Sequence, residues 1–492
     1  MSRNKDLVQN TIIIFIGTIC TKLLSFILLP LYTNVLSTSE YGVVDLLTTL
    51  ISLISPIISL QISQGLFKNL VDCRNNIEKQ KKIISTSITF ILINSIICVI
   101  IFLIVSPFIN NNYKWFLAAT VVISVFSDLL LQIARGVGRN DIYSIAGVVT
   151  AIFTIFCNIL FLVFLHFKVN GMLFGTLIGY MMGIIYLYFK LRLYKLVNFK
   201  YFNKKDFKLL MKYSLPLVPN ALSWWIFNAS DRVIVSLLLG LSFTGILSVS
   251  YKFSSIIVLF YNIFDKSWCE SIILHIKDND IIEYFNKTFI KIFNLFYSFS
   301  ICLLAFMPIL FKILIADSFI DAYNIIPIVL VASIFQVIVG LVSVVYAAND
   351  DTKSLANTAI WSSVVNLIVH LVLIKYIGIY AAAVSTLCSY SFFAIYRAYD
   401  VSKKYIPLKF NVKYYLPVII CLLIIIGCYY SNLILIKIFG MIIALLYSII
   451  SNKNEIFLIK EIVLKKIKKM RGWFLWVVYI LMKKVYKLLF HF

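Results

Sequence analysis

The feature that most constrains this chain is a succession of apolar segments, each about 20 residues long, separated by short polar connections. A helix of that length crosses the hydrocarbon core of a bilayer with every backbone hydrogen bond satisfied internally. With 61% apolar residues, the chain leaves no room for a large soluble domain. The sequence therefore predicts an all-α integral membrane protein of about 14 transmembrane helices. We expect them near 11–31, 41–64, 83–107, 115–134, 141–166, 170–190, 214–238, 243–264, 288–315, 322–347, 355–375, 378–397, 414–431 and 433–450.

Basic residues indicate the topology of these helices. If the N-terminus is cytoplasmic, 36 of the 45 Lys and Arg residues fall in cytoplasmic segments. Such a bias toward one side is typical of cytoplasmic loops. It supports an even number of spans with both termini in the cytoplasm, and it explains most of the net charge of +24. A nucleic-acid surface is not expected, because the basic residues are spread over separate loops. The first ten residues lack a small-residue cleavage pattern, so we expect the first span to be retained.

A long basic connection divides the first twelve helices into two sets of six. It reads "KLRLYKLVNFKYFNKKDFKLLMK" at 190–212. Two segments of the first set align with segments of the second: "LSTSEYGVVDLL" (36–47) with "LGLSFTGILSVS" (239–250), and "NILFLVFLHFKVNGMLFG" (158–175) with "NLIVHLVLIKYIGIYAAA" (366–383). The similarity indicates two homologous six-helix bundles with the substrate path between them.

These observations predict five divisions of the chain. We expect an N-terminal six-helix bundle at 1–190, a cytoplasmic basic linker at 191–213, a second six-helix bundle at 214–397, two appended transmembrane helices at 398–450 and a basic amphipathic tail at 451–492. The longest apolar run of the tail, "GWFLWVVYILM", is too short to span a bilayer, so the tail is expected to lie on anionic lipid. The nine cysteines show no metal-ligand spacing and are interpreted as small apolar residues. We expect no metal and no cofactor.

Polar and charged residues recur on one face of several predicted spans. A cation near the middle of a bilayer is costly, so Lys22 and Lys252 need a polar environment or an interacting group. Polar stripes on six helices from both halves predict a water-filled cavity between the bundles. The candidate binding residues are Lys22, Lys252, Arg232, Asp231, Asp45, Asp128, Asn228 and Trp225. Alternatives remain open for four of them: Asp231 and Arg232 in interhelical ion pairs with neighbouring residues, Asp45 in contact with water near the outer end of its helix, and Trp225 as a core packing residue.

Catalysis is not expected from this sequence. A glycine-rich phosphate loop ending in Gly-Lys-Ser/Thr does not occur, which argues against an ATP-driven pump. The external loops are only a few residues long and have no room for a cluster of catalytic carboxylates.

Three stretches carry a resemblance to a known family. They are "GTICTKLLSFILLPLYTNVLSTSEYGVVDLLTTL", "RGVGRNDIYSIAGVV" and "SLPLVPNALSWWIFNASDRVIVSLLLG". They resemble the polysaccharide flippases (Wzx-type, O-antigen and capsule) of the multidrug/oligosaccharidyl-lipid/polysaccharide exporter superfamily. The resemblance covers the first twelve helices and implies two six-helix lobes around a central cavity, with helices thirteen and fourteen appended.

The resemblance also implies a function and partners. Such flippases move undecaprenyl-diphosphate-linked oligosaccharides across the bacterial cytoplasmic (inner) membrane, from the cytoplasmic to the outer leaflet. Expected partners are this lipid-linked glycan, membrane lipid, a polysaccharide polymerase and a chain-length regulator. In the cavity, cations would meet the phosphates, and hydroxyls and amides would meet the sugars.

The sequence leaves the cargo and the coupling ion open. A lipid II-type or teichuronic-acid precursor is an alternative cargo. A multidrug antiporter of the same superfamily is the main competing function, although it would favour an acidic cavity, whereas Lys22, Lys252 and Arg232 suit an anionic cargo. A proton or a sodium ion is the candidate coupling ion, with His370, Asp128 or Asp231 as its site.

Overall fold

Helices form almost all of the part of the chain that can be described. The computed structural model describes residue 26 and residues 28–74, 76–108, 111–349, 351–408 and 412–453. Within these ranges there is no β-strand, and ten helices are long and apolar enough to cross a membrane. The chain is thus an all-α, multi-pass membrane protein, as predicted. The first expected span, 11–31, lies mostly outside the described residues, as does most of the tail.

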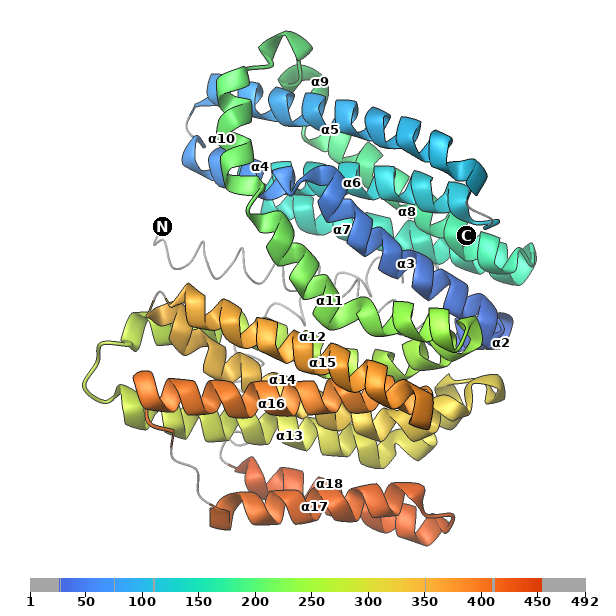
Figure 1. Ribbon diagram of the computed structural model, residues 1–492, viewed down its shortest axis with the longest axis vertical. Helices are drawn as coiled ribbons and strands as arrows, with labels where there is room; N and C mark the ends of the chain where they lie inside the picture. Colours follow the sequence, from blue (N-terminus) through green and yellow to red (C-terminus); the bar gives the residue numbers. More distant parts are fainter. Residues whose placement is uncertain are drawn as a thin grey trace, which may run out of the picture. The chain divides into compact units, whose positions relative to one another are not determined.

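The remaining expected spans each correspond to a described helix (Figure 1). The α-helices of the first half are α2 (Leu29–Val35), α3 (Thr38–Ser59), α4 (Ile62–Asp72), α5 (Ile77–Val105), α6 (Lys114–Gly136), α7 (Asn140–Ile159, extended by a π-turn over Leu160–Phe164), α8 (Lys168–Lys190), α9 (Leu193–Leu196) and α10 (Lys204–Ser214). Those of the second half are α11 (Leu217–Leu238), α12 (Leu241–His275), α13 (Ile281–Leu314), α14 (Asp321–Ala348), α15 (Thr352–Ile377), α16 (Tyr380–Lys404), α17 (Val412–Tyr430) and α18 (Ile434–Ser451). Short 3-10 turns cover Ser106–Phe108, Phe199–Tyr201 and Asp317–Phe319.

One predicted helix boundary is wrong. The span expected at 41–64 ends at Ser59, because Leu60 and Gln61 both adopt left-handed backbone angles, with φ of 45° and 56°. That conformation costs roughly 1–2 kcal/mol per non-glycine residue, so packing must compensate for it. Beyond the break, Leu66 and Leu70 of α4 are fully buried in the apolar core shared with α6. Ser63 therefore belongs to α4 and does not continue the face of α3 that carries Asp45 and Ser52.

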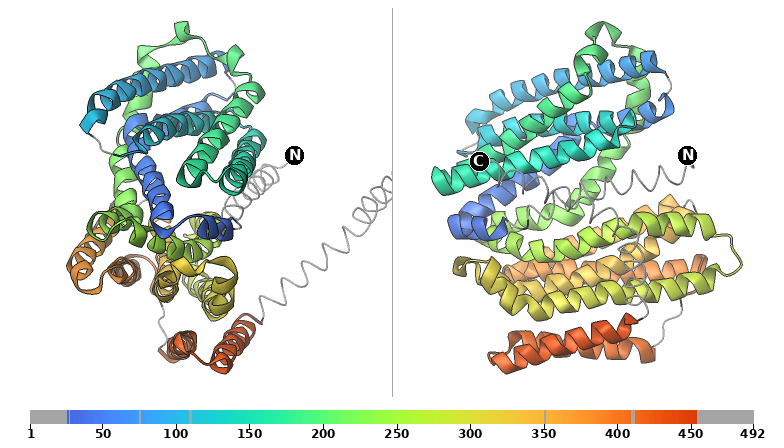
Figure 2. Two further views of the ribbon diagram at one scale, coloured as in Figure 1. Left: turned by 90° about the vertical axis from the view of Figure 1, so that its right-hand side faces the viewer. Right: turned by 180° about the vertical axis from the view of Figure 1, so that it is seen from behind.

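Glycines bring α7 and α8 into close contact, and the two helices lie side by side in Figure 2. Gly175, Gly179 and Gly183 follow one another at four-residue spacing on α8. A β-carbon at Gly179 would lie 1.9 Å from Oγ1 of Thr154, and one at Gly183 would lie 2.1 Å from Oγ1 of Thr150. Small residues at this spacing are a common way for membrane helices to approach, since apolar burial gives no driving force inside lipid.

In the second half, α12, α14, α15 and α16 pack against one another. A buried arginine of α16, Arg397, links two of these helices through hydrogen bonds. Its Nε donates to Oγ1 of Thr358 at 2.9 Å and its Nη2 donates to the carbonyl of Leu355 at 3.0 Å, both on α15. Its guanidinium also lies 4.1 Å from the centre of the Phe393 ring. These contacts satisfy a cation that would otherwise be costly to bury.

Helices α3 and α12 cross at a pair of glycines, and the crossing is reciprocal. A β-carbon at Gly42 would lie 1.9 Å from the carbonyl oxygen of Leu241, and one at Gly245 would lie 2.0 Å from that of Thr38. In the alignment of 36–47 with 239–250, Gly42 corresponds to Gly245 and Thr38 corresponds to Leu241. Equivalent residues of the two aligned segments therefore face each other, as expected where a twofold pseudo-symmetry axis passes between two repeats.

The chain separates into two compact units. One comprises Met1–Asp278 and Ile309–Pro407, and the other comprises Asn279–Pro308 and Leu408–Phe492. In the described part of the second unit, α17 and α18 form an antiparallel pair (Figure 2). The first part of α13 joins them: the hydroxyl of Tyr297 donates to the carbonyl of Val418 at 2.6 Å, and Asn452 donates to Ser298 at 2.8 Å.

Candidate functional site

A polar cavity of about 400 Å³ lies within the first unit. Most of its lining residues belong to four helices of the second half of the chain, α11, α12, α14 and α16. Helix α3 of the first half contributes Asp45. Its lining residues are Phe26, Asp45, Asp231, Arg232, Ser248, Tyr251, Lys252, Ser254, Ser255, Ile256, Val258, Leu259, Asn262, Val329, Ala332, Ser333, Gln336, Thr386 and Tyr390. The volume is that of a small-molecule site, and hydroxyl, amide and charged groups are unusually frequent in its wall.

Four of the eight candidate residues line this cavity. They are Asp45, Asp231, Arg232 and Lys252, and the sequence had assigned all four to such a place. Two are acidic and two are basic, so the four charges balance. Because an isolated charge is expensive to bury, the arrangement of these groups determines which ligands the cavity accepts.

Arg232 forms an ion pair with Asp45 of α3. Nε of Arg232 lies 2.9 Å from Oδ2 of Asp45, and the two side chains are 22% and 16% exposed. The guanidinium also lies 5.5 Å from the centre of the Tyr251 ring. The pair joins a residue of the first half of the chain to a residue of the second, and both of its members line the cavity.

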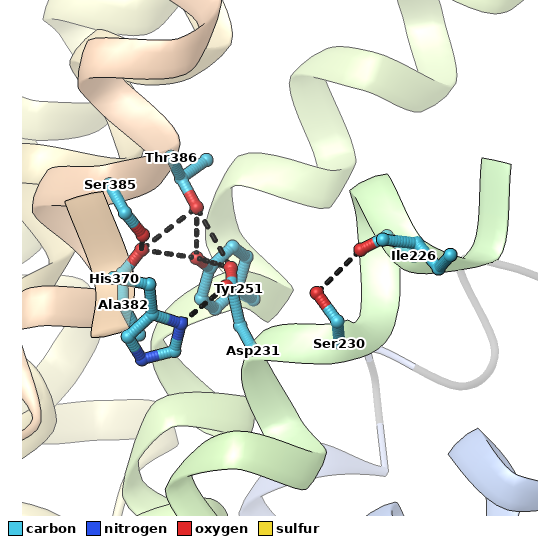
Figure 3. Close-up of polar contacts among 8 residues, drawn as sticks. All are labelled: Ile226, Ser230, Asp231, Tyr251, His370, Ala382, Ser385 and Thr386. Atoms are coloured by element: carbon cyan, nitrogen blue, oxygen red, sulfur yellow. Dashed lines mark hydrogen bonds and ion pairs between the residues drawn. The ribbon is translucent and has the colours of Figure 1, made fainter. Parts of the chain in front are cut away.

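Asp231 does not face α3 but points toward Tyr251, His370 and Thr386 of the second half of the chain (Figure 3). Its Oδ1 lies 2.8 Å from Nδ1 of His370, and its Oδ2 lies 3.0 Å from Oγ1 of Thr386 and 3.3 Å from the hydroxyl of Tyr251. Asp231 is only 6% exposed and His370 is fully buried. An ionised carboxylate only accepts hydrogen bonds, so Nδ1 of His370 carries the proton. Nε2 of His370 is buried with no hydrogen-bond partner among the residues that the structure describes.

The geometry of α11 explains why neighbouring residues have different partners. Successive side chains on an α-helix are about 100° apart, so Asp231 and Arg232 face different directions. Both side chains form the interhelical contacts that the sequence left open as an alternative: Arg232 pairs with Asp45 of α3, and Asp231 contacts residues of α12, α15 and α16. The hydroxyl of the preceding residue, Ser230, donates to the carbonyl of Ile226, one turn earlier on α11, at 2.5 Å (Figure 3).

Two further candidates lie outside the cavity wall. Nε1 of Trp225 donates to the carbonyl of Thr49 at 3.0 Å and to the hydroxyl of Ser52 at 3.1 Å, and so holds α11 against α3. Asp128 lies on an exposed part of α6, 3.5 Å from Nε2 of Gln132. Lys22 lies outside the described residues, and so does the side chain of Asn228, which belongs to α11.

Two of the residues that form hydrogen bonds with Asp231, namely Tyr251 and Thr386, were not predicted as site residues. Tyr251 precedes Lys252 in the sequence, and Thr386 lies in a run of small residues on α16 with no charged neighbour. A tyrosine and a threonine in apolar helices give no sequence signal of their own. His370 was identified as a candidate for ion coupling, and the structure brings it to Asp231. Within the described ranges, no three His, Cys, Asp or Glu side chains come together as a metal site would require.

Comparisons with known proteins agree on the fold. An inward-facing multidrug resistance MATE family transporter of the MOP superfamily matches with a TM-score of 0.65 and 13% identity, over 78% of this chain and 95% of that one. The lipid II flippase MurJ, in an inward closed conformation, matches with a TM-score of 0.65 and 17% identity, over 91% and 100% of the two chains. An outward-facing MATE transporter matches with a TM-score of 0.57 and 15% identity, over 81% and 94%. A comparison with curated protein sequences gives no match.

The sequence model of one family covers residues 7–267, which is more than half of the chain. That region includes α3, the ion-paired Arg232 and the cavity residues of α12. The family model is described as a polysaccharide biosynthesis protein, and the fold is the one found in the MATE and MurJ transporters. The chain belongs to the polysaccharide biosynthesis protein family, within the fold shared by the MATE and MurJ transporters.

Proposed function

We propose that this protein is a flippase that moves undecaprenyl-diphosphate-linked oligosaccharide repeat units across the bacterial cytoplasmic membrane, for O-antigen, capsule or exopolysaccharide synthesis. One observation carries the proposal: Arg232 and Lys252 line the same cavity as hydroxyl and amide side chains, in a member of a polysaccharide biosynthesis family. This combination matches a cargo that is anionic at one end and rich in hydroxyl groups beyond it.

The cations suit the diphosphate. The guanidinium of Arg232 presents N–H groups in a planar fork that matches phosphate oxygens in a bidentate manner. The ammonium of Lys252, on α12, adds a point charge in the same cavity. Lys22 of the first span is proposed as a third cation, from the first half of the chain. Ser255, Asn262 and Gln336 offer hydroxyl and amide groups for sugars.

The two halves of the chain give a mechanism of translocation. In this proposal the bundles at 1–190 and 214–397 rock against each other, the basic segment 191–213 connects them on the cytoplasmic side, and 398–450 adds two helices. The distribution of Lys and Arg supports cytoplasmic termini and cargo entry from the cytoplasmic leaflet. A polymerase and a chain-length regulator would receive the cargo on the outer side.

We infer that a proton, and not a sodium ion, couples transport. The group of described residues that contact Asp231 includes the imidazole of His370 and the hydroxyl of Thr386. Histidine changes its charge within the physiological pH range, and chains of Asp, Glu and His carry protons in many transporters. A hard cation instead favours a shell made of oxygen atoms, and the imidazole in contact with Asp231 works against such a shell.

Transport by the purified protein tests the proposal. Proteoliposomes receive a fluorescent undecaprenyl-diphosphate-linked disaccharide in one leaflet, and a membrane-impermeant quencher reports its arrival in the other. We expect transport by the wild type, and loss of about 10- to 150-fold of the apparent affinity in Arg232→Gln, since a charge-assisted hydrogen bond contributes about 1.5–3 kcal/mol. Lys353→Gln removes an exposed cation outside the cavity and should behave like the wild type.

Two controls distinguish the competing functions. Lipid II offered as a competitor should inhibit less well than the oligosaccharide-linked lipid if the cargo is a polysaccharide repeat unit. A cationic dye offered alone should not be transported, because it has no anionic group for Arg232 and Lys252 to bind. Dye transport without lipid transport would identify a multidrug antiporter and refute the proposed function.

A further inference from the structure

We propose that Asp45 competes with the cargo for Arg232: its carboxylate forms an ion pair with the guanidinium, and the diphosphate of the cargo displaces that carboxylate, which releases α3 from α11. The inference rests on the proposed function for the identity of the anion. It adds a role for Asp45, a carboxylate that has no obvious use in a site for an anionic ligand.

The ion pair lies where a ligand can reach it. Arg232 and Asp45 both line the cavity, and their side chains are partly exposed, although the paired atoms Nε and Oδ2 are themselves buried. An incoming anion therefore meets the other parts of the guanidinium first. The carboxylate of Asp45 approaches Nε of Arg232 at 2.9 Å. A phosphate is also an oxyanion that accepts from guanidinium N–H groups, so the two compete for the same donor.

The pair is one of the polar contacts between α11 and α3 that the described residues show. Another is the indole of Trp225, which donates to Thr49 and Ser52 of α3. From Trp225 to Arg232 the chain rises two turns along α11, and the partners on α3 run the opposite way, from Ser52 to Asp45. The helices are therefore antiparallel here, with a neutral contact at one point and an ionic contact about 10 Å along the seam. An anion in the cavity acts directly on the ionic contact.

Charge exchange gives the anion a preference for one state. When a phosphate binds the guanidinium of Arg232, the carboxylate of Asp45 loses its ion-pair partner. It then lies next to a second negative charge, and the repulsion between the two anions displaces Asp45. A ligand shifts a conformational equilibrium only by its differential affinity for the two states. Here the difference arises because Arg232 binds phosphate fully only after Asp45 has left, in the state with α3 released. A neutral lipid has no such preference.

Distances between spin labels test the release directly. In the full-length protein without its native cysteines, Thr48→Cys and Leu237→Cys place labels at exposed positions on α3 and on α11, the two helices that the inference separates. Double electron–electron resonance is recorded with undecaprenyl diphosphate in the bilayer, and with undecaprenol as the neutral lipid of the same chain length. Binding of each lipid is measured in the same samples.

Three variants give the expected pattern. In the wild type, undecaprenyl diphosphate should lengthen the distances and undecaprenol should not. Asp45→Asn should show the longer distances without lipid and bind undecaprenyl diphosphate about three- to tenfold more tightly, because the competing ion pair is gone. Arg232→Gln should show the longer distances and bind weakly. Lys168→Gln breaks the exposed pair between Lys168 and Glu40 of α3, which lies within the first half, and should leave distances and binding unchanged.

Two results would overturn the inference in different ways. If undecaprenyl diphosphate binds the wild type but leaves the distances unchanged, and Asp45→Asn resembles the wild type, the ion pair does not control the release of α3 from α11. The proposed function would still stand. If the diphosphate lipid does not bind the wild type at all, the proposed function fails and release by cargo fails with it, whatever Asp45→Asn does to the distances.

Discussion

Adding one methyl group at the crossing of α3 and α12 should destabilise the state in which these helices are in contact. In Gly245→Ala the new β-carbon would lie 2.0 Å from the carbonyl oxygen of Thr38, and in Gly42→Ala it would lie 1.9 Å from that of Leu241. Both oxygens belong to helix backbones and cannot rotate away as a side chain can. The helices themselves must separate.

The size of the effect follows from the overlap. A carbon and a carbonyl oxygen approach to about 3.3 Å at closest, so the backbones must part by about 1.3 Å. Overpacking of this kind costs about 1–3 kcal/mol, while alanine gains up to about 1 kcal/mol over glycine within a helix. Because one separation relieves both overlaps, the double variant should cost less than the sum of the two single variants.

Thermal stability of the detergent-solubilised protein measures this cost. The apparent melting temperature should fall by a few degrees in each single variant. Gly427→Ala is the matched control: it lies within α17, nothing lies within 4 Å of the position of its β-carbon, and it should leave the melting temperature unchanged or slightly raised. If Gly42→Ala and Gly245→Ala match Gly427→Ala, or if their effects simply add, the crossing is not the tight contact described here.

Three further predictions concern charge. His370→Gln should keep a hydrogen bond to Asp231 but abolish the dependence of transport on a pH gradient. If the dependence is unchanged, His370 is not the site of proton coupling. Lys22→Arg should retain export of surface polysaccharide, whereas Lys22→Ala and Lys22→Glu should lose it at normal membrane abundance; full export by Lys22→Met would contradict phosphate binding. Asp351 lies outside the spans and caps α15, and hydrogen bonds from Ser354 lower its pKa to about 2. Its contribution to stability should be present above about pH 4 and fall as the pH drops toward 2, so Asp351→Ala should cost about 1 kcal/mol at pH 7 and less in acid, as measured by thermal unfolding.

The candidate site could be anticipated in part because charges inside membrane helices are rare. Lys252, Asp231 and Arg232 stand out in any apolar segment, and their cost in lipid already implies a polar environment. Thr386 and Tyr251 lack that signal, since threonine and tyrosine are common in membrane helices for packing reasons alone. The sequence left open interhelical ion pairs for Asp231 and Arg232 but could not name their partners, which depend on the rotation of α11 between its neighbours.

The sequence by itself determined the class of fold, because a bilayer requires about 20 apolar residues for each crossing and that requirement is local in the chain. It also indicated the repeat and the membrane-buried charges. Only the tertiary structure decided that α3 ends at Ser59, that Gly42 faces Gly245, and that Asp45 pairs with Arg232. These outcomes depend on how far each helix rotates and how closely it approaches its neighbours. Both are set by small residues and backbone breaks that come together from distant parts of the chain, where no local pattern records them.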